Sequence, residues 1–161
     1  MWLWLIRHAK SSWAISHQRD FDRPLNERGL RDAPNMQAWL ANEPHGPTWV
    51  WSSDAVRAEA TATFVQSAVQ GATLTTDHRL YAASPEAILD VVRGTPQGFE
   101  SVAVVAHNPG ITYCVNLLCG RNVIDSLPTF GIARVHWPGD VTDLAVGEAA
   151  LEVLMWPKRL P

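Results

Sequence analysis

Cysteine is scarce in this chain, whose 161 residues include only Cys114 and Cys119. Both lie in one apolar stretch, residues 113–119, and their spacing matches neither a disulfide framework nor a metal-binding motif. The pattern indicates small thiols buried in a reducing compartment, so we expect a cytoplasmic protein without a metal site.

An excess of positive charge is also missing. The formal net charge is −3, so no basic field over the whole chain would recruit nucleic acid, and any anion-binding site must be local. No apolar run approaches the roughly 20 residues of a membrane span. Residues 1–6 lack the basic leader and cleavage site of a signal peptide. We therefore expect a protein that binds neither nucleic acid nor membrane.

What the sequence does contain is an alternation of strand-like and helix-like segments. Hydrophobic residues make up 47% of the chain, which is enough for a core, and the length fits one domain over residues 1–161. Strands are expected at residues 2–6, 48–52, 101–106, 130–137 and 150–156, and a short strand or extended segment at residues 73–80. Helices are expected at residues 26–40, 53–70, 84–94 and 109–118. This alternation predicts an α/β fold with a mainly parallel sheet, the last two strands lying near its edge.

Three of the expected strands end in basic or imidazole side chains. The first runs into Arg7 and His8, the second into two serines and then Arg57, and the fourth into His107. Ligands of open α/β sheets bind at the carboxyl ends of the strands. Because none of these junctions supplies an obvious acid, the cluster suits a phosphoryl group.

Local geometry explains how these side chains could share one site. Successive strand residues point to opposite faces, so Arg7 and His8 act together only if the chain turns at the small Ala9. Arg57, about one turn into its helix, leans back toward the strand ends. Asn108 precedes a proline and can cap the helix that follows, whose free N–H groups bind oxyanions.

The expected cluster therefore contains two guanidinium groups, two imidazoles and a helix N-terminus. Guanidinium groups match phosphate oxygens with two hydrogen bonds at once. A neutral imidazole would be a nucleophile, and a protonated one a charge-stabilising donor. A histidine nucleophile would split phosphoryl transfer into two steps through a covalent phosphoimidazole.

Four motifs occur in order at the expected element boundaries: LIRHAKSSW at residues 5–13, DRPLNERG at 22–29, SSDAVRA at 52–58 and AHNPG at 106–110. Together they resemble the histidine phosphatase superfamily of phosphoglycerate mutase-like proteins. Within it, the chain looks most like the small SixA-type phosphohistidine phosphatases. The resemblance covers roughly the first 120 residues.

The resemblance implies a three-layer α/β/α sandwich with a mainly parallel central sheet. It implies that His8 is the nucleophile phosphorylated in turnover, and that Arg7, Arg57 and His107 hold the phosphoryl oxygens. It implies no metal and no cofactor. The implied substrate is a phosphohistidine-bearing protein, and a small phosphorylated molecule stays open as the alternative.

Three further residues are candidate substrate contacts: Asn108, Lys10 and Arg23. Lys10 could assist phosphate binding or simply be solvated. Arg23 could reach the substrate, but we favour an ion pair with Asp22 that pins the loop. Trp13, in the same loop, could line the mouth of the site.

The chain departs from the family pattern in ways that bear on the substrate. Ala9 and Ala106 replace residues that are often glycine, which affects fit more than chemistry. The mutase-type branch carries a proton-donating carboxylate after its third strand, whereas residues 80–85 here contain no acid, and Glu86 is expected in a helix's first turn. An alcohol leaving group needs a proton, while a phosphoramidate nitrogen takes one from solvent. The missing acid therefore favours phosphohistidine or another activated phosphoryl donor.

Other functional classes stay open from the residues alone. A catalytically degenerate phosphate-binding module is one, although the intact set of Arg7, His8, Arg57 and His107 weighs against it. A metallohydrolase using His8 and His107 is another, but the sequence lacks a close carboxylate cluster and a His-x-x-x-His helix. We expect a monomer.

Overall fold

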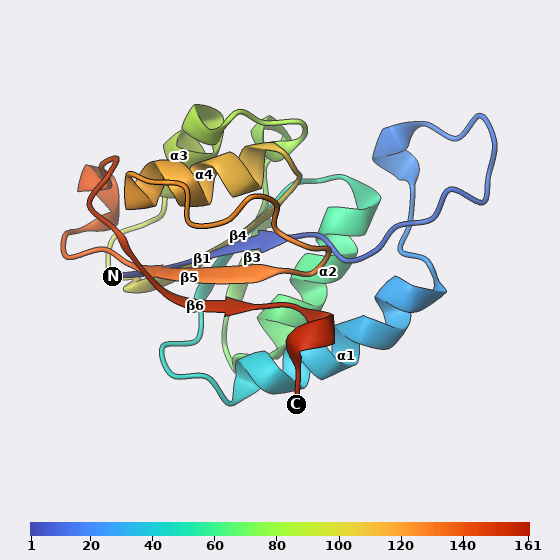
Figure 1. Cartoon of the computed structure of the whole chain (residues 1–161), viewed down its shortest axis with the longest axis horizontal. Helices are drawn as coiled ribbons and strands as arrows, with labels where there is room; N and C mark the ends of the chain where they lie inside the picture. Colours follow the sequence, from blue (N-terminus) through green and yellow to red (C-terminus); the bar gives the residue numbers. More distant parts are fainter.

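Six strands form one sheet in the computed structural model, which describes residues 1–161, and their order is β3-β2-β4-β1-β5-β6 (Figure 1). The strands are β1 (Trp2–Arg7), β2 (Trp49–Ser52), β3 (Thr73–Thr76), β4 (Ser101–Ala106), β5 (Ile132–His136) and β6 (Ala150–Met155). The helices are α1 (Glu27–Ala41), α2 (Val56–Ser67), α3 (Pro85–Arg93) and α4 (Gly110–Cys119). The α/β prediction is confirmed.

The sheet is mixed, which refines the prediction of a mainly parallel one. Strands β1 to β4 are parallel, whereas β5 runs antiparallel to β1, and β6 antiparallel to β5. The reason lies in residues 120–131, which return from the end of α4 to the carboxyl end of β1. Strand β5 therefore starts there, with Ile132 opposite Ile6.

Both faces of the sheet are covered by helices, which explains its continuous apolar strands. In β1, Leu3 and Leu5 pack into the core beneath α3 and α4, while Trp4 and Ile6 pack into the core beneath α1 and α2. All four side chains are fully buried. The three layers are visible in Figure 1, where the parallel strands point toward the long loop of residues 9–24. None of the helices is long and apolar enough to cross a membrane.

Two predicted helix starts are confirmed by their caps. Asn26 Oδ1 accepts a hydrogen bond from the backbone N–H of Gly29 at 2.9 Å, and Ser84 Oγ accepts one from Ala87 at 3.2 Å. Pro34 lies inside α1. Helix α2 begins later than expected, because residues 53–55 form a turn.

Two local expectations were wrong. The third strand ends at Thr76, and the chain then forms a short 3-10 helix, His78–Leu80, capped by the Asp77 side chain. Asn108 does not cap a backbone N–H of α4: its Oδ1 accepts from the Thr112 hydroxyl at 2.6 Å, and its amide nitrogen donates to the Leu127 carbonyl oxygen at 2.9 Å. The oxygen that would cap the helix is therefore occupied by a side chain of the first turn.

Gly29 should be required for the close approach of α1 to the loop that follows β1. A Cβ atom at this position would collide with the carbonyl oxygen of Lys10. We expect Gly29→Ala to lower the free energy of unfolding by about 1–3 kcal/mol, although alanine is the better helix former. Urea unfolding of both proteins measures the difference. Asn35→Ala, at an exposed position of the same helix, should be nearly neutral; an equal loss in both variants would contradict this account.

Candidate active site

The backbone of His8 is held from both sides immediately after β1. Its N–H donates to the Ala106 carbonyl oxygen at 3.2 Å, and its carbonyl accepts from the Phe130 N–H at 3.0 Å. The side chain is 8% exposed. Strand β4 and the segment before β5 thus fix the backbone position from which the His8 imidazole extends.

The ring of His8 is held in one tautomer. Nδ1 lies 2.7 Å from the Ala9 carbonyl oxygen, which can only accept, so Nδ1 carries the proton and Nε2 keeps its lone pair. The Ala9 peptide is itself fixed, because its N–H donates to Thr61 Oγ1 at 2.9 Å. The Thr61 hydroxyl in turn donates to the Arg57 carbonyl oxygen at 2.8 Å. Helix α2 therefore positions the imidazole through one hydroxyl.

Arg57, in the first turn of α2, reaches the free nitrogen of His8. Its Nε donates to His8 Nε2 at 3.3 Å, and the guanidinium is almost fully buried. The two outer nitrogens donate to Asp20, one to the backbone carbonyl at 2.6 Å and the other to the carboxylate at 2.8 Å. Asp20 also accepts from Tyr81 and from Arg23, each at 2.7 Å. This network holds Arg57 beside His8 Nε2.

His107 follows β4 and completes the pair of imidazoles. Its ring centroid is 5.1 Å from that of His8, and its Nε2 is hydrogen-bonded to Ser53 Oγ at 2.8 Å. Nδ1 of His107 is buried without a hydrogen-bond partner. Such an orphaned atom costs about 1–3 kcal/mol and is typical of sites organised for function.

Arg7 is hydrogen-bonded to the segment before β5. One outer nitrogen donates to the Leu127 carbonyl oxygen at 3.1 Å, while Nε is buried without a partner. Its charge nevertheless acts on both imidazoles, whose pKa values it helps to lower. The structure therefore brings Arg7, His8, Arg57 and His107 together at the carboxyl ends of β1 and β4.

Burial keeps both imidazoles neutral. It lowers the pKa of His8 to about 3, with a smaller effect from the positive charges of Arg57 and Arg7. Burial likewise lowers the pKa of His107 to about 4, and Arg57 contributes again. Burial works to raise the pKa of Asp20, but hydrogen bonds from Tyr81, Arg57 and Arg23 outweigh it and hold that pKa well below its usual range.

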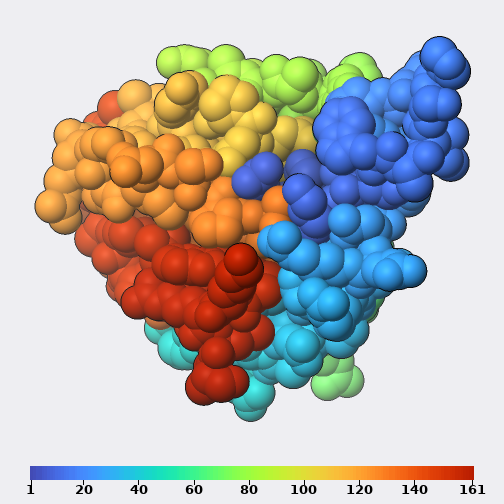
Figure 2. All heavy atoms as spheres, turned by 45° about the vertical axis from the view of Figure 1, so that its right-hand side comes forward, coloured from blue at the N-terminus to red at the C-terminus, as the bar shows by residue number.

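Two cavities flank the cluster. One, of about 390 Å³, is lined by Arg7 and Lys10 among others; the second, of about 410 Å³, is lined by His107, Asn108 and the start of α4. Figure 2 shows a few dark-blue atoms from the first part of the chain in a hollow between gold and orange atoms on one side and the blue atoms of the loop after β1 on the other.

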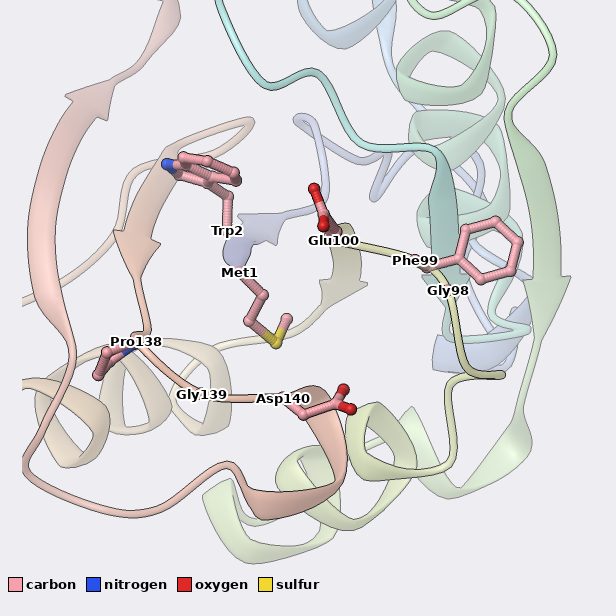
Figure 3. Close-up of a pocket in the computed structure, with 8 residues that line it drawn as sticks. All are labelled: Met1, Trp2, Gly98, Phe99, Glu100, Pro138, Gly139 and Asp140. Carbon is pink, nitrogen blue, oxygen red and sulfur yellow. The ribbon is translucent and has the colours of Figure 1, made fainter.

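A further cavity, of about 460 Å³, lies at the opposite end of the sheet (Figure 3). It surrounds Met1 and Trp2, at the amino end of β1, and is therefore separated from His8 by the length of the strand. Its ionisable side chains are the carboxylates of Glu100 and Asp140, with no arginine, lysine or histidine. This lining does not suit a phosphoryl group.

The secondary candidates have mixed outcomes. Lys10 lines the cavity beside Arg7. Arg23 is buried, pairs with Asp20 and stacks its guanidinium 3.3 Å from the ring centroid of the exposed Trp13. The predicted pair of Arg23 with Asp22 was wrong, because Asp22 pairs with Arg19 at 2.7 Å. A three-residue helical turn at Asp20–Asp22 points the two carboxylates at different arginines.

Sequence reasoning missed four residues that organise the cluster: Asp20, Ser53, Thr61 and Tyr81. Each makes a hydrogen bond with a residue distant in sequence, and no local pattern reveals that partner. Asp20 and Tyr81, for example, are 61 positions apart. No group of three or more His, Cys, Asp or Glu side chains is placed to hold a metal ion.

The chain is similar in sequence and in fold to several known proteins. An uncharacterized protein of Mycobacterium leprae is 29% identical over 164 residues, covering 95% of this chain and all of the relative. A Nakamurella multipartitia structure named for the phosphohistidine phosphatase SixA has a TM-score of 0.85 at 26% identity, covering 97% of this chain and 95% of that one. A SixA-named structure from Agrobacterium tumefaciens has a TM-score of 0.84 at 27% identity, covering 97% of each chain.

The family model of the histidine phosphatase superfamily (branch 1) matches residues 3–83. That span is half of the chain and includes Arg7, His8, Asp20 and Arg57. This protein therefore belongs to the histidine phosphatase superfamily, branch 1.

Proposed function

We propose that the protein is a phosphohistidine phosphatase that acts on phosphorylated proteins through a phosphohistidine intermediate on His8. The observation that carries this proposal is the state of the His8 ring. Its Nε2 keeps a lone pair because Nδ1 donates to Ala9, and burial lowers its pKa so that the ring is neutral at physiological pH. A neutral imidazole beside two guanidinium groups is an activated nucleophile for phosphorus.

The reaction would take two displacements. His8 Nε2 attacks phosphorus, the bond from phosphorus to the leaving nitrogen breaks, and the leaving imidazole takes a proton from solvent. Water then attacks the phosphorus of phospho-His8, which releases inorganic phosphate, returns a neutral His8 and gives its excess proton to solvent. Both steps depend mainly on in-line placement and charge neutralisation.

The remaining members of the cluster would bind the phosphoryl oxygens. Arg57 Nε already lies beside His8 Nε2 and can donate to an oxygen of the attacked group. Arg7 and His107 would hold the other oxygens. These oxygens would then give hydrogen-bond partners to Arg7 Nε and His107 Nδ1, which have none at present. Preorganised donors of this kind supply most of the transition-state stabilisation in phosphoryl transfer.

The acids near the site support a leaving group that needs no enzymic proton. Asp20 is the carboxylate bound to Arg57, and three donors keep it ionised, so it has no proton to give. Glu86 is exposed in the first turn of α3. Solved relatives named for a phosphohistidine phosphatase agree with this substrate class.

We further propose that residues 1–161 act as one histidine phosphatase domain in the cytoplasm. Every strand belongs to one sheet. The free thiols of Cys114 and Cys119 suit a reducing compartment.

The first test is the covalent intermediate. His8→Ala should abolish turnover of a phosphohistidine protein, because the nucleophile is removed. Acid-labile, base-stable phosphate should be trapped on the wild-type protein and be missing from the variant. Circular dichroism should show that the variant is folded. Label on the folded alanine variant would show that another residue is the nucleophile.

Stability should fall in acid because of the two buried imidazoles. Their pKa values in the folded protein, about 3 and about 4, lie below the ordinary value of 6.5. The unfolded chain therefore binds more protons between about pH 4 and 6.5, and the free energy of unfolding decreases as pH falls through that range.

Urea unfolding at about pH 7 and about pH 5 measures this loss. His8→Gln and His107→Gln should each make it smaller, because glutamine does not titrate. His17→Gln, at an exposed position, is the matched control and should leave it unchanged. The same loss in all three variants would contradict neutral, buried imidazoles.

Substrate preference should follow the leaving group. The kcat/KM for phosphohistidine or an activated aryl phosphate should exceed that for an alkyl phosphate by at least about 100-fold, which is the usual contribution of a general acid. Glu86→Gln should change these rates little. Comparable rates on sugar phosphates, or a large loss in the Glu86 variant, would instead indicate an acid-assisted phosphomonoesterase.

A further inference from the structure

The chain has only two lysines, and both line the same cavity. Lys10 and Lys158 lie at opposite ends of the sequence, yet they share a cavity of about 390 Å³ with Arg7. Arg28 is the fourth basic residue in its wall. The sheet explains this meeting, because the register across β1, β5 and β6 aligns Ile6, Ile132 and Met155 and so brings the C-terminal segment level with the residues after β1.

The cavity is positively charged and contains no acid. Its other lining residues are Pro128, Thr129, Trp156 and Pro157. Neither Lys10 nor Lys158 takes part in an ion pair, although most arginines of the chain do. Arg28 has only a loose contact with Asp32, at 3.6 Å. In a chain with net charge −3, such a local excess of positive charge favours the binding of an anion.

The walls of the cavity are held in place by the same segments that hold the catalytic cluster. The Arg7 guanidinium donates to the carbonyl oxygen of Leu127, directly before the lining residues Pro128 and Thr129. Arg28 reaches across to Thr129 Oγ1 at 3.3 Å. Lys158 is presented on a 3-10 turn, Pro157–Arg159, that begins with a proline. The backbone around the cavity is therefore held by hydrogen bonds and a proline turn, and neither lysine side chain is engaged in an ion pair.

Arg7 connects this cavity to the reacting histidine. It directly precedes His8, its charge lowers the pKa of the His8 imidazole, and its side chain lines the cavity. An anion in the cavity would therefore lie next to a phosphoryl group bound at His8. In Figure 2, dark-blue atoms from the first part of the chain lie beside the orange atoms, and the red C-terminal segment lies below these.

We propose that this cavity is a second anion subsite, in which Lys10, Lys158 and Arg28 bind a carboxylate or phosphate carried by the same substrate. The subsite selects substrates in which the scissile phosphoryl group is flanked by a second negative charge. That the anion bound beside His8 is the scissile phosphoryl group depends on the function proposed above.

Binding of two inorganic anions tests the subsite without any turnover. Isothermal titration calorimetry compares orthophosphate, which fills one site, with tripolyphosphate, which can reach the second. Wild-type protein should bind tripolyphosphate more tightly. The double variant Lys10→Gln, Lys158→Gln should lose about tenfold in affinity for tripolyphosphate, because it loses two partly exposed ion pairs with the ligand. Its loss of affinity for orthophosphate should be much smaller.

The matched control removes two positive charges elsewhere. Arg31 and Arg121 are exposed and do not line the cavity, so the double variant Arg31→Gln, Arg121→Gln should keep the wild-type ratio of the two affinities. An equal loss in the control, or no wild-type preference for tripolyphosphate, would overturn the subsite.

Kinetics separate this proposal from the proposed function and identify the source of the anion. Turnover of p-nitrophenyl phosphate by wild type reports on the catalytic site alone. If wild type does not hydrolyse this ester, the proposed phosphatase function is contradicted. The ratio of the tripolyphosphate and orthophosphate affinities still tests the subsite. A phosphohistidine peptide with flanking glutamates should be hydrolysed faster than its glutamine counterpart, and Lys10→Gln with Lys158→Gln should remove that difference. If the calorimetric preference holds and the peptides behave alike, the second anion is a phosphate of a small substrate.

Discussion

The hydrogen bond from His8 Nδ1 to the carbonyl oxygen of Ala9 constrains the whole cluster. It fixes the tautomer, and the tautomer decides that Nε2 is the nitrogen with a lone pair. The bond requires the Ala9 peptide to turn out of strand geometry, and Thr61 on α2 stabilises that turn by accepting from the Ala9 N–H. The same hydroxyl donates to the Arg57 backbone, so one side chain sets the positions of both the Ala9 peptide and Arg57.

The second constraint is the balance of charge around Arg57. A buried guanidinium beside a neutral imidazole needs a counter-charge, and Asp20 supplies it from a loop that is otherwise open to solvent. Because Asp20 also accepts from Tyr81 and Arg23, it remains ionised and cannot act as a proton donor. The carboxylate that holds the Arg57 guanidinium therefore has no proton to give.

Much of the fold and of the candidate site could be predicted from local sequence. The buried strands β1 and β4 are apolar runs, Asn26 and Ser84 are typical N-caps, and Arg7, His8, Arg57 and His107 stand at element boundaries. Each of these signals lies within a few residues of the feature it predicts. The predicted ion pair of Asp22 with Arg23 was wrong, because the pairing of charges in this loop depends on the shape of the loop and not on their spacing in sequence.

The sequence by itself determined the order of the elements, their caps and the four polar side chains at three strand ends, since hydrophobic periodicity and capping act over short distances. Only the tertiary structure decided that β5 and β6 run antiparallel, that Asp20 meets Arg57 and Tyr81, and that Lys10 and Lys158 share a cavity. These contacts join residues between 37 and about 150 positions apart. No local preference encodes them, because they arise when the packing of both sheet faces fixes where each strand and loop ends.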